Sequence, residues 1–141
     1  MRILAVDPGE KRIGIAISDP LGMIANPLQI IEHVSRPVDA AMIVSLAIEH
    51  DAGKIVIGQA LDADDQPTPQ SRRASRLAEA VCQQTSLPVE LWDESGSTQA
   101  ARSAHIAIGG SARRRRQHGH GHLDDLAATF ILQTYLDANA Q

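Results

Sequence analysis

The hydrophobic and polar positions of this chain change their period along its length. Short apolar runs cover residues 2–7, 12–18 and 24–31, and the turn sequences "DPGEK" and "DPLG" separate them. Apolar runs bounded by Pro, Gly and Asp predict strands that are joined by tight turns. We therefore expect the chain to begin with an antiparallel meander of three strands.

The rest of the chain alternates helical spacing with two further apolar runs. The runs are "KIVIG" at 54–58 and "LPVELWDE" at 87–94, and each predicts a strand. Ser35 and Thr68 are expected to cap the first two helices. The predicted helices cover Pro37–Glu49, Pro69–Cys82, Ser97–Ile108 and Leu123–Asp137. Helices between strands imply parallel pairing, so the pattern predicts an α/β fold: a mixed five-stranded sheet with helices on both faces.

Length and composition predict one domain over residues 1–141. No apolar stretch approaches the roughly 20 residues of a membrane span, and the first residues do not follow the pattern of a signal peptide. We expect a cytoplasmic protein.

The single cysteine, Cys82, is expected to pack in the buried stripe of its helix with Leu77, Ala78 and Val81.

Carboxylates follow two of the predicted strands. Asp7 ends the first apolar run, and the pair Asp93 and Glu94 ends the fifth. Functional groups of α/β sheets gather at the carboxyl ends of strands, and crowded carboxylates are unfavourable unless a cation neutralises them. The pattern indicates a site for a hard metal ion with oxygen ligands. The alternative for Asp7 is a turn residue whose side chain accepts hydrogen bonds from nearby backbone amides.

The last helix adds a further acid. Its densest apolar stripe is predicted to consist of Leu123, Leu126, Ala127, Phe130 and Ile131. Asp124 falls beside this stripe and Asp125 nearly opposite to it, so Asp124 is the one expected to reach inward. The alternative is that both acids complement the positive end of the helix dipole.

Basic residues are concentrated before this helix, although the net charge of the chain is −4. No acid lies between Glu94 and Asp124, and we expect the basic side chains in this window to bind a phosphate backbone. The candidate nucleic-acid-binding residues in this window are Arg102, Arg113, Arg114, Arg115 and Arg116. Lys11 and Arg12, at the first turn of the chain, are further candidates. The alternative for the arginine run is a solvated charged segment.

The sequence "HGHGH" adds histidines to the same segment. His118, His120 and His122 alternate with glycine in a predicted loop. His120 or His122 is expected to transfer a proton to the leaving group. A transition-metal site or a solvated linker are the alternatives.

Three segments together resemble one bacterial protein family. They are "RILAVDPGEKRIGIAISDPLG" at the start, the strand ending "VELWDE", and "LDDLAATFILQTYLD" near the end. They are similar to the YqgF family, which is described as a group of pre-16S ribosomal RNA nucleases and, earlier, as Holliday junction resolvases. The resemblance covers nearly the whole chain and implies a ribonuclease-H-like fold.

The resemblance assigns roles to the same acids. It implies that Asp7, Glu94 and Asp124 are catalytic and hold Mg²⁺ or Mn²⁺, with Asp93 in support. Two ions about 3.5–4 Å apart would activate water and stabilise the leaving oxygen. The implied substrate is structured precursor ribosomal RNA, cleaved at the 5′ end of 16S RNA during ribosome biogenesis. The alternative substrate is branched DNA, and the alternative function is that of a non-catalytic RNA or ribosome-assembly binder. The protein is expected to be a monomer or a weak homodimer.

Two segments depart from the family pattern. The fifth strand continues as "SGST", where the family usually has an arginine, and "QALDADDQPTP" replaces a loop that is usually richer in Pro and Asn. These departures bear on substrate binding more than on metal binding. The first hairpin also resembles the phosphate loop of sugar kinases, but those folds need two such domains and this chain has the length of one.

Overall fold

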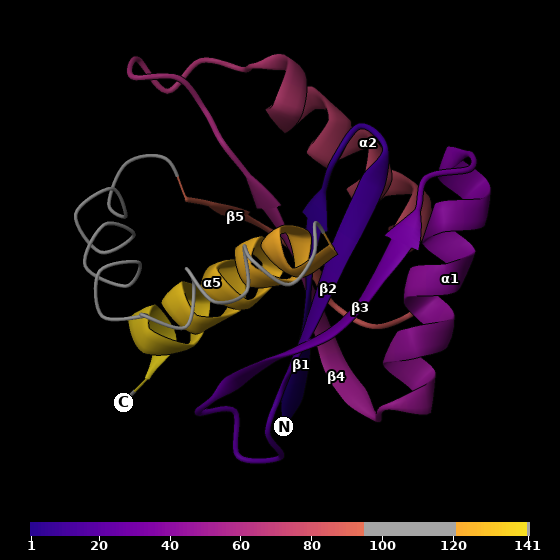
Figure 1. The fold of residues 1–141 in the computed structure, drawn as a ribbon, viewed down its shortest axis with the longest axis vertical. Helices are drawn as coiled ribbons and strands as arrows, with labels where there is room; N and C mark the ends of the chain where they lie inside the picture. The colour runs from indigo at the N-terminus through magenta and orange to yellow at the C-terminus, as the bar shows by residue number, and fades with distance from the viewer. Residues whose placement is uncertain (95–120, 141) are drawn as a thin grey trace.

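A computed structural model of the protein describes residues 1–94 and 121–140, and for residues 121–125 it describes the backbone alone. Helices cover both faces of one five-stranded sheet (Figure 1). The strand order across the sheet is β3-β2-β1-β4-β5. The predicted fold class is therefore confirmed. The predicted helix at 97–108 lies outside the described residues.

The first three strands form the predicted meander. They are β1 (Arg2–Pro8), β2 (Arg12–Ser18) and β3 (Ala25–Glu32), and both pairings are antiparallel. Each strand lies within one residue of its predicted bounds. The register places Asp7 opposite Gly14 of β2.

The remaining strands pair in parallel, as the alternation with helices requires. β4 (Ala52–Gln59) lies beside β1, and β5 (Val89–Asp93) lies beside β4 at the edge of the sheet. Helix α1 (Arg36–Glu49) precedes β4, and α2 (Pro69–Cys82) connects β4 to β5. The predicted caps are confirmed for both helices, because the side chains of residues 35 and 68 accept hydrogen bonds from the first-turn amides.

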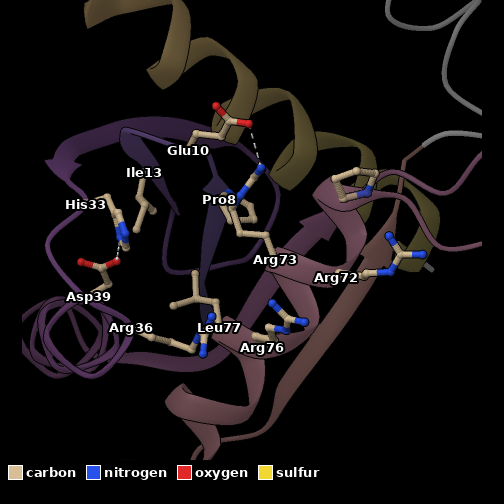
Figure 2. Close-up of a pocket in the computed structure, with 12 residues that line it drawn as sticks. Pro8, Glu10, Ile13, His33, Arg36, Asp39, Arg72, Arg73, Arg76 and Leu77 are labelled. Carbon is tan, nitrogen blue, oxygen red and sulfur yellow. Dashed lines mark hydrogen bonds and ion pairs between the residues drawn. The ribbon is translucent and has the colours of Figure 1, made fainter.

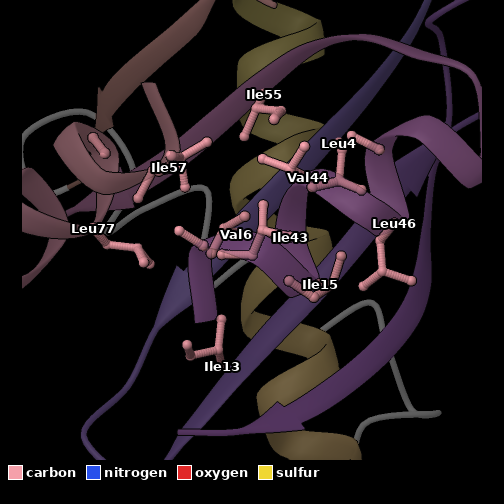
Figure 3. Packing of buried hydrophobic residues seen from close by; sticks show 14 of the residues in the cluster. Leu4, Val6, Ile13, Ile15, Ile43, Val44, Leu46, Ile55, Ile57 and Leu77 are labelled. Carbon is pink, nitrogen blue, oxygen red and sulfur yellow. The ribbon is translucent and has the colours of Figure 1, made fainter. Parts of the chain in front are cut away.

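The two faces of the sheet carry separate hydrophobic cores. Side chains alternate along each strand, so Leu4 and Val6 face α1 and α2, whereas Ile3 and Ala5 face the last helix. Figure 3 shows the larger core beneath α1 and α2. The faces of the sheet can therefore be assigned residue by residue.

Helix α5 (Gly121–Asn139) covers the second face with a stripe that matches the predicted one only in part: Phe130 and Ile131 are buried as predicted, whereas Leu126 and Ala127 are only half-buried. Its residues in the core are Ala128, Ile131, Leu132, Tyr135 and Leu136. The middle and end of the helix lie on the sheet, so the prediction gave too much weight to the leucines near its start. Positions 124 and 125 then lie at similar angles from the buried stripe, and helical period alone does not separate them.

The beginning of α5 also differs from the prediction. The helix starts at Gly121, so His122 belongs to its first turn rather than to a loop between glycines. The backbone of a residue in a helix is fixed by the helical hydrogen bonds around it. The prediction that His122 lies in a loop is therefore wrong.

Two contacts determine the direction of α5 on the sheet. Ile131 lies over Gly58 at the end of β4, and a Cβ atom on Gly58 would be 2.4 Å from Ile131 Cδ1. Near the start of β4, Lys54 Nζ donates hydrogen bonds to Tyr135 Oη and to Glu90 Oε1, the latter at 3.1 Å. The hydrogen bond with Tyr135 is the main cause that raises the pKa of Lys54. Helix α5 thus runs opposite to β4, and its first residues point toward the carboxyl end of the sheet.

The prediction for Cys82 is wrong, because this residue is exposed. It is the last residue of α2 and follows Val81 by one position, which turns its side chain about 100° away from that of Val81. None of the helices in the described ranges is long and apolar enough to cross a membrane.

The contact between Gly58 and Ile131 predicts a specific sensitivity in β4. Gly58→Ala should lower the free energy of unfolding by about 1–3 kcal/mol, because the added methyl group overpacks the interface with α5. Urea unfolding followed by circular dichroism measures the change.

Gly53→Ala is the matched control in the same strand. A Cβ atom there meets Cγ and Sδ of Met1, the far end of a flexible side chain that can move away. We expect no loss of stability in this variant. Equal losses in the free energy of unfolding of both variants would show that the close contact with Ile131 is not the cause of the destabilisation.

Candidate active site

Asp7 lies at the carboxyl end of β1 and faces α5. It follows Ile3 and Ala5 in the alternation of the strand, and it is half-buried. Its cross-strand partner on β2 is Gly14, and Val6 pairs with Ile57, so the next residue of β4 is Gly58. Asp7 therefore has glycine on both neighbouring strands. Sequence analysis missed these two glycines, whose signal was an isolated Gly inside each apolar run.

Glu94 reaches the same face from the edge of the sheet. Its backbone N–H donates to the carbonyl oxygen of Gln59 at 3.0 Å, which continues the pairing of β4 and β5 by one residue. Trp92, two residues earlier, packs against the α5 core and donates from Nε1 to Thr134 Oγ1 at 3.2 Å. By alternation Glu94 shares this face, and its Oε2 atom is buried.

Asp93 faces the other side of the sheet. It follows Leu91, which packs against the core under α1 and α2. Its Oδ1 atom accepts a hydrogen bond from the N–H of Leu61 at 3.5 Å, and this contact ties β5 to the loop after β4. Of the two neighbouring acids, Glu94 is thus the one placed on the face of Asp7.

The placement of Asp7 and Glu94 fits a cation. The strands that carry them are separated by β4 alone, so their backbones are about 10 Å apart. Two carboxylates on the same face of the sheet, at the carboxyl ends of nearby strands, repel each other unless a positive charge lies between them. Their oxygen atoms suit a hard divalent ion such as Mg²⁺ or Mn²⁺.

The third predicted ligand, Asp124, lies near the start of α5, where only the backbone is described. It precedes Ile131 by seven residues, which is two helical turns. Because Ile131 lies at the end of β4, the backbone of Asp124 continues toward the edge that carries Asp7 and Glu94. Among the side chains that the structure describes, no three His, Cys, Asp or Glu residues form a metal-binding group.

Other predicted site residues fall partly outside the described residues. Those outside are Arg102, Arg113, Arg114, Arg115, Arg116, His118 and His120, together with the side chain of His122. Lys11, on the turn between β1 and β2, and Arg12, the first residue of β2, are described and are exposed. Gly9 closes this turn by donating from its N–H to the Arg12 carbonyl oxygen at 3.0 Å, where a Cβ atom would be 2.3 Å from the same oxygen.

The unusual loop after β4 is held together by its own side chains. The Oδ1 atom of Asp62 accepts hydrogen bonds from the amides of Asp64 and Gln66 at 2.9 and 2.8 Å. Gln70 of α2 accepts from the N–H of Ala60 at 2.6 Å, which fixes the start of the loop. The departure from the family pattern therefore forms an ordered turn.

A family model described as "RuvX: Holliday junction resolvase" matches residues 1–138. The chain belongs to this family. The resemblance to the YqgF family is confirmed, because curated relatives across the full chain carry its nuclease name. The family is one of nucleases, enzymes that hydrolyse phosphodiester bonds, and the predicted enzyme class is confirmed with it.

Two relatives illustrate the match. A protein of Syntrophus aciditrophicus is 40% identical over 141 residues, which cover 100% of this chain and 91% of the relative. A protein of Myxococcus xanthus is 36% identical over 139 residues, which cover 99% of this chain and 89% of the relative. Both carry the name of a proposed pre-16S rRNA nuclease.

Solved structures share the fold at low sequence identity. Thermus thermophilus RuvC in complex with a Holliday junction substrate has a TM-score of 0.61 at 12% identity, covering 98% of this chain and 94% of its own. The fowlpox virus Holliday junction resolvase has a TM-score of 0.58 at 18% identity, covering 98% and 99%. These likenesses support the ribonuclease-H-like architecture.

The opposite faces of Asp93 and Glu94 predict different effects on metal binding. Glu94→Gln should weaken Mn²⁺ binding by about 100-fold or more, since loss of a ligand should cost at least as much as loss of an outer-shell partner. Asp93→Asn should bind Mn²⁺ like the unmodified protein, because an amide oxygen can still accept from Leu61. Isothermal titration calorimetry compares the two variants. The reverse order of affinities would assign the ligand role to Asp93.

Proposed function

We propose that residues 1–141 form one nuclease domain that cleaves precursor 16S ribosomal RNA in the cytoplasm. In this proposal Asp7, Glu94 and Asp124 hold Mg²⁺ or Mn²⁺. The observation that carries this proposal is the position of Asp7 and Glu94. Both lie on the α5 face of the sheet, at the carboxyl ends of their strands, and the start of α5 points toward them. The name shared by the full-length relatives supports the RNA substrate.

Each group has a distinct task in this reaction. A divalent ion held by these carboxylates would supply an activated water and would stabilise the departing oxygen. Asp7 and Glu94 provide the negative oxygen atoms that hold such an ion at the sheet edge. Lys11 and Arg12, exposed on the adjacent turn, bind backbone phosphates beside the scissile bond.

The segment between β5 and α5, together with His122 in the first turn of α5, completes the proposed substrate site. The arginines at 102 and 113–116 would hold the RNA through its phosphates, and His120 or His122 would give a proton to the leaving oxygen. Both roles follow from the sequence alone.

Cleavage of a precursor RNA tests the proposal directly. The substrate is a 16S RNA fragment that retains its 5′ extension, incubated with Mg²⁺ or Mn²⁺ and, separately, with a chelator. The unmodified protein should cleave it only with the metal. Asp7→Asn should lower the rate by about 100-fold or more, because the substitution keeps the shape of the side chain and removes its charge.

Asp19→Asn is the matched control for this experiment. Asp19 also lies in a turn after a strand, and its Oδ1 atom accepts hydrogen bonds from the amides of Met23 and Ile24 at 2.6 and 2.8 Å. An amide oxygen can replace it there, so the rate should not change. If Asp7→Asn cleaves as fast as the control, Asp7 is a turn residue only.

A four-way DNA junction is the second candidate substrate. It is favoured by the description of the family model and by the shared fold of the two resolvases. Junction resolution needs two symmetric active sites and therefore a dimer. Light scattering of the protein on junction DNA should show a dimer if this candidate is right, and a monomer mass would exclude it. Salt-sensitive RNA binding without cleavage would indicate a non-catalytic binder instead.

A further inference from the structure

A second site lies at the same edge of the sheet, on the face opposite to Asp7. It is a pocket of about 440 Å³ between α1, α2 and the turn that joins β1 to β2. Pro8 and Gly9, which directly follow Asp7, form part of its wall, and Figure 2 shows the side chains that line it. The pocket and the carboxylates are therefore separated by the strands and the turn between them.

Four arginines line this pocket. Arg36 comes from the first residue of α1, and Arg72, Arg73 and Arg76 come from α2 (Figure 2). Arg73 pairs with Glu10 at 3.3 Å, and the Glu10 side chain is 80% exposed. Among the described residues, no carboxylate lies within ion-pair distance of the other three guanidinium groups. The pocket thus sets four arginines against two carboxylates, Glu10 and Asp39, and is positive in a chain whose net charge is −4.

This arrangement is unfavourable for the helices that carry it. Arg72 and Arg76 are four residues apart on one helix, a spacing at which like charges repel. Arg36 and Arg72 also lie in or next to the first turns of their helices, where the helix dipole is positive and acidic residues are preferred. An anion in the pocket would relieve both costs.

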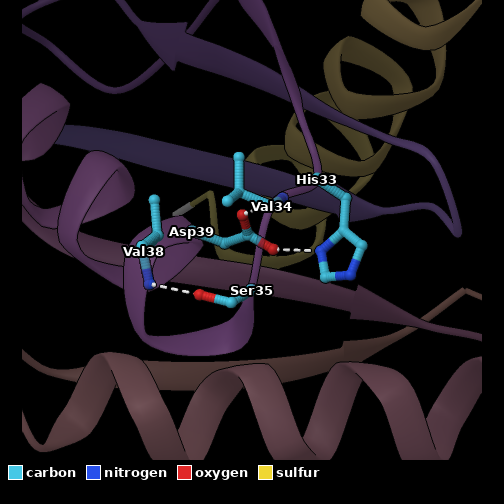
Figure 4. Close-up of polar contacts among 5 residues, drawn as sticks. All are labelled: His33, Val34, Ser35, Val38 and Asp39. Carbon is cyan, nitrogen blue, oxygen red and sulfur yellow. Dashed lines mark hydrogen bonds and ion pairs between the residues drawn. The ribbon is translucent and has the colours of Figure 1, made fainter.

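A buried acid holds one further side chain at the wall. Asp39, which is 2% exposed, accepts hydrogen bonds from His33 Nδ1 and from the N–H of Val34, the latter at 3.0 Å (Figure 4). Ser35 caps α1 beside them through the N–H of Val38. The His33 ring is therefore fixed in orientation, and when protonated its Nε2 atom can donate to an anion in the pocket.

We propose that this pocket binds a non-scissile backbone phosphate of the nucleic-acid substrate, through the guanidinium groups of Arg36, Arg72 and Arg76. The inference rests on the proposed nuclease function for the identity of the polymer. Guanidinium groups bind phosphate oxygens in pairs and without regard to base sequence. The site therefore contributes affinity and positions the strand.

Two observations favour a backbone phosphate over a free nucleotide. No Phe, Tyr or Trp occurs among the described residues of the pocket, so nothing there stacks a base. Exposed Lys11 and Arg12 lie at the end of the turn that joins β1 to β2, whose first residues line the pocket directly after Asp7. A strand held at Asp7 that crosses this turn would meet positive charge before it reaches the arginines.

The salt dependence of RNA binding tests the proposal without cleavage. Each variant is made in an Asp7→Asn background, and binding of the labelled precursor RNA is followed by anisotropy in chelator over a range of salt concentrations. Arg72→Gln with Arg76→Gln should weaken binding at least about tenfold. It should also lower the slope of log K against log salt by roughly 1.4–1.8, since each lost phosphate contact removes about 0.7–0.9.

Two controls separate this effect from a general loss of charge or of folding. Arg2→Gln removes one arginine at the opposite end of β1, where it donates to the His50 carbonyl oxygen at 3.5 Å. It should leave the slope unchanged, whereas Arg76→Gln alone should lower it. Arg72→Lys with Arg76→Lys keeps both charges and should keep the slope, with weaker binding because the paired hydrogen bonds are lost.

The outcomes distinguish this inference from the proposed function. A lowered slope supports the pocket even if the unmodified protein cleaves no RNA, whereas an unchanged slope overturns it even if cleavage is efficient. Calorimetry with pyrophosphate and AMP tests whether the pocket binds a small phosphorylated compound instead of a backbone phosphate. If the double glutamine variant loses their binding but keeps the RNA slope, the pocket holds a small phosphorylated compound and the backbone assignment is wrong.

Discussion

The contact of Ile131 with Gly58 determines how closely the last helix lies on the sheet. A side chain at position 58 would overlap Ile131, so α5 can take its place only because β4 has a glycine at this level. Small side chains around the contact, among them Ala5, Ala16 and Ala128, are fully buried and keep the layers close. The start of α5 is thereby brought toward the strand ends that carry Asp7 and Glu94.

At the carboxyl ends of the central strands, the two faces of the sheet carry groups of opposite charge: carboxylates on one face and arginines on the other. Alternation along β1 turns Asp7 toward α5, whereas Pro8 lines the pocket under α1 and α2. Carboxylates that would hold a cation and arginines that would hold a phosphate are thus kept apart by the sheet itself. Direct pairing between the two groups, which would neutralise both, is prevented by this separation.

The strands and the acids at their ends could be predicted from the sequence because both depend on local patterns. Apolar runs fixed β1 and β2 within one residue, and the positions of Asp7 and Glu94 follow from where those runs stop. The choice between Asp93 and Glu94 could not be made from the sequence, since the neighbouring Leu91 and Trp92 are both apolar and only their packing against α2 and α5 shows which face each takes.

Features that depend on packing between distant elements could not be predicted in this way. The buried stripe of α5 is set by where the helix crosses the sheet, and the apolar residues Leu123 and Leu126 near its start suggested a different face. The pocket joins Arg36 of α1 to arginines of α2 more than 30 residues later, and only the packing of the two helices against each other brings them together. Sequence analysis therefore missed this cluster.

In the proposed active site a divalent ion binds between Asp7 and Glu94, on the α5 face of the sheet at the carboxyl ends of β1 and β5. The most direct measurement is anomalous diffraction from crystals of the protein soaked with Mn²⁺. We expect an anomalous peak within coordination distance of carboxylate oxygens from both residues and from the first turn of α5. A peak at Asp93 on the opposite face, or no peak at this edge, would contradict it.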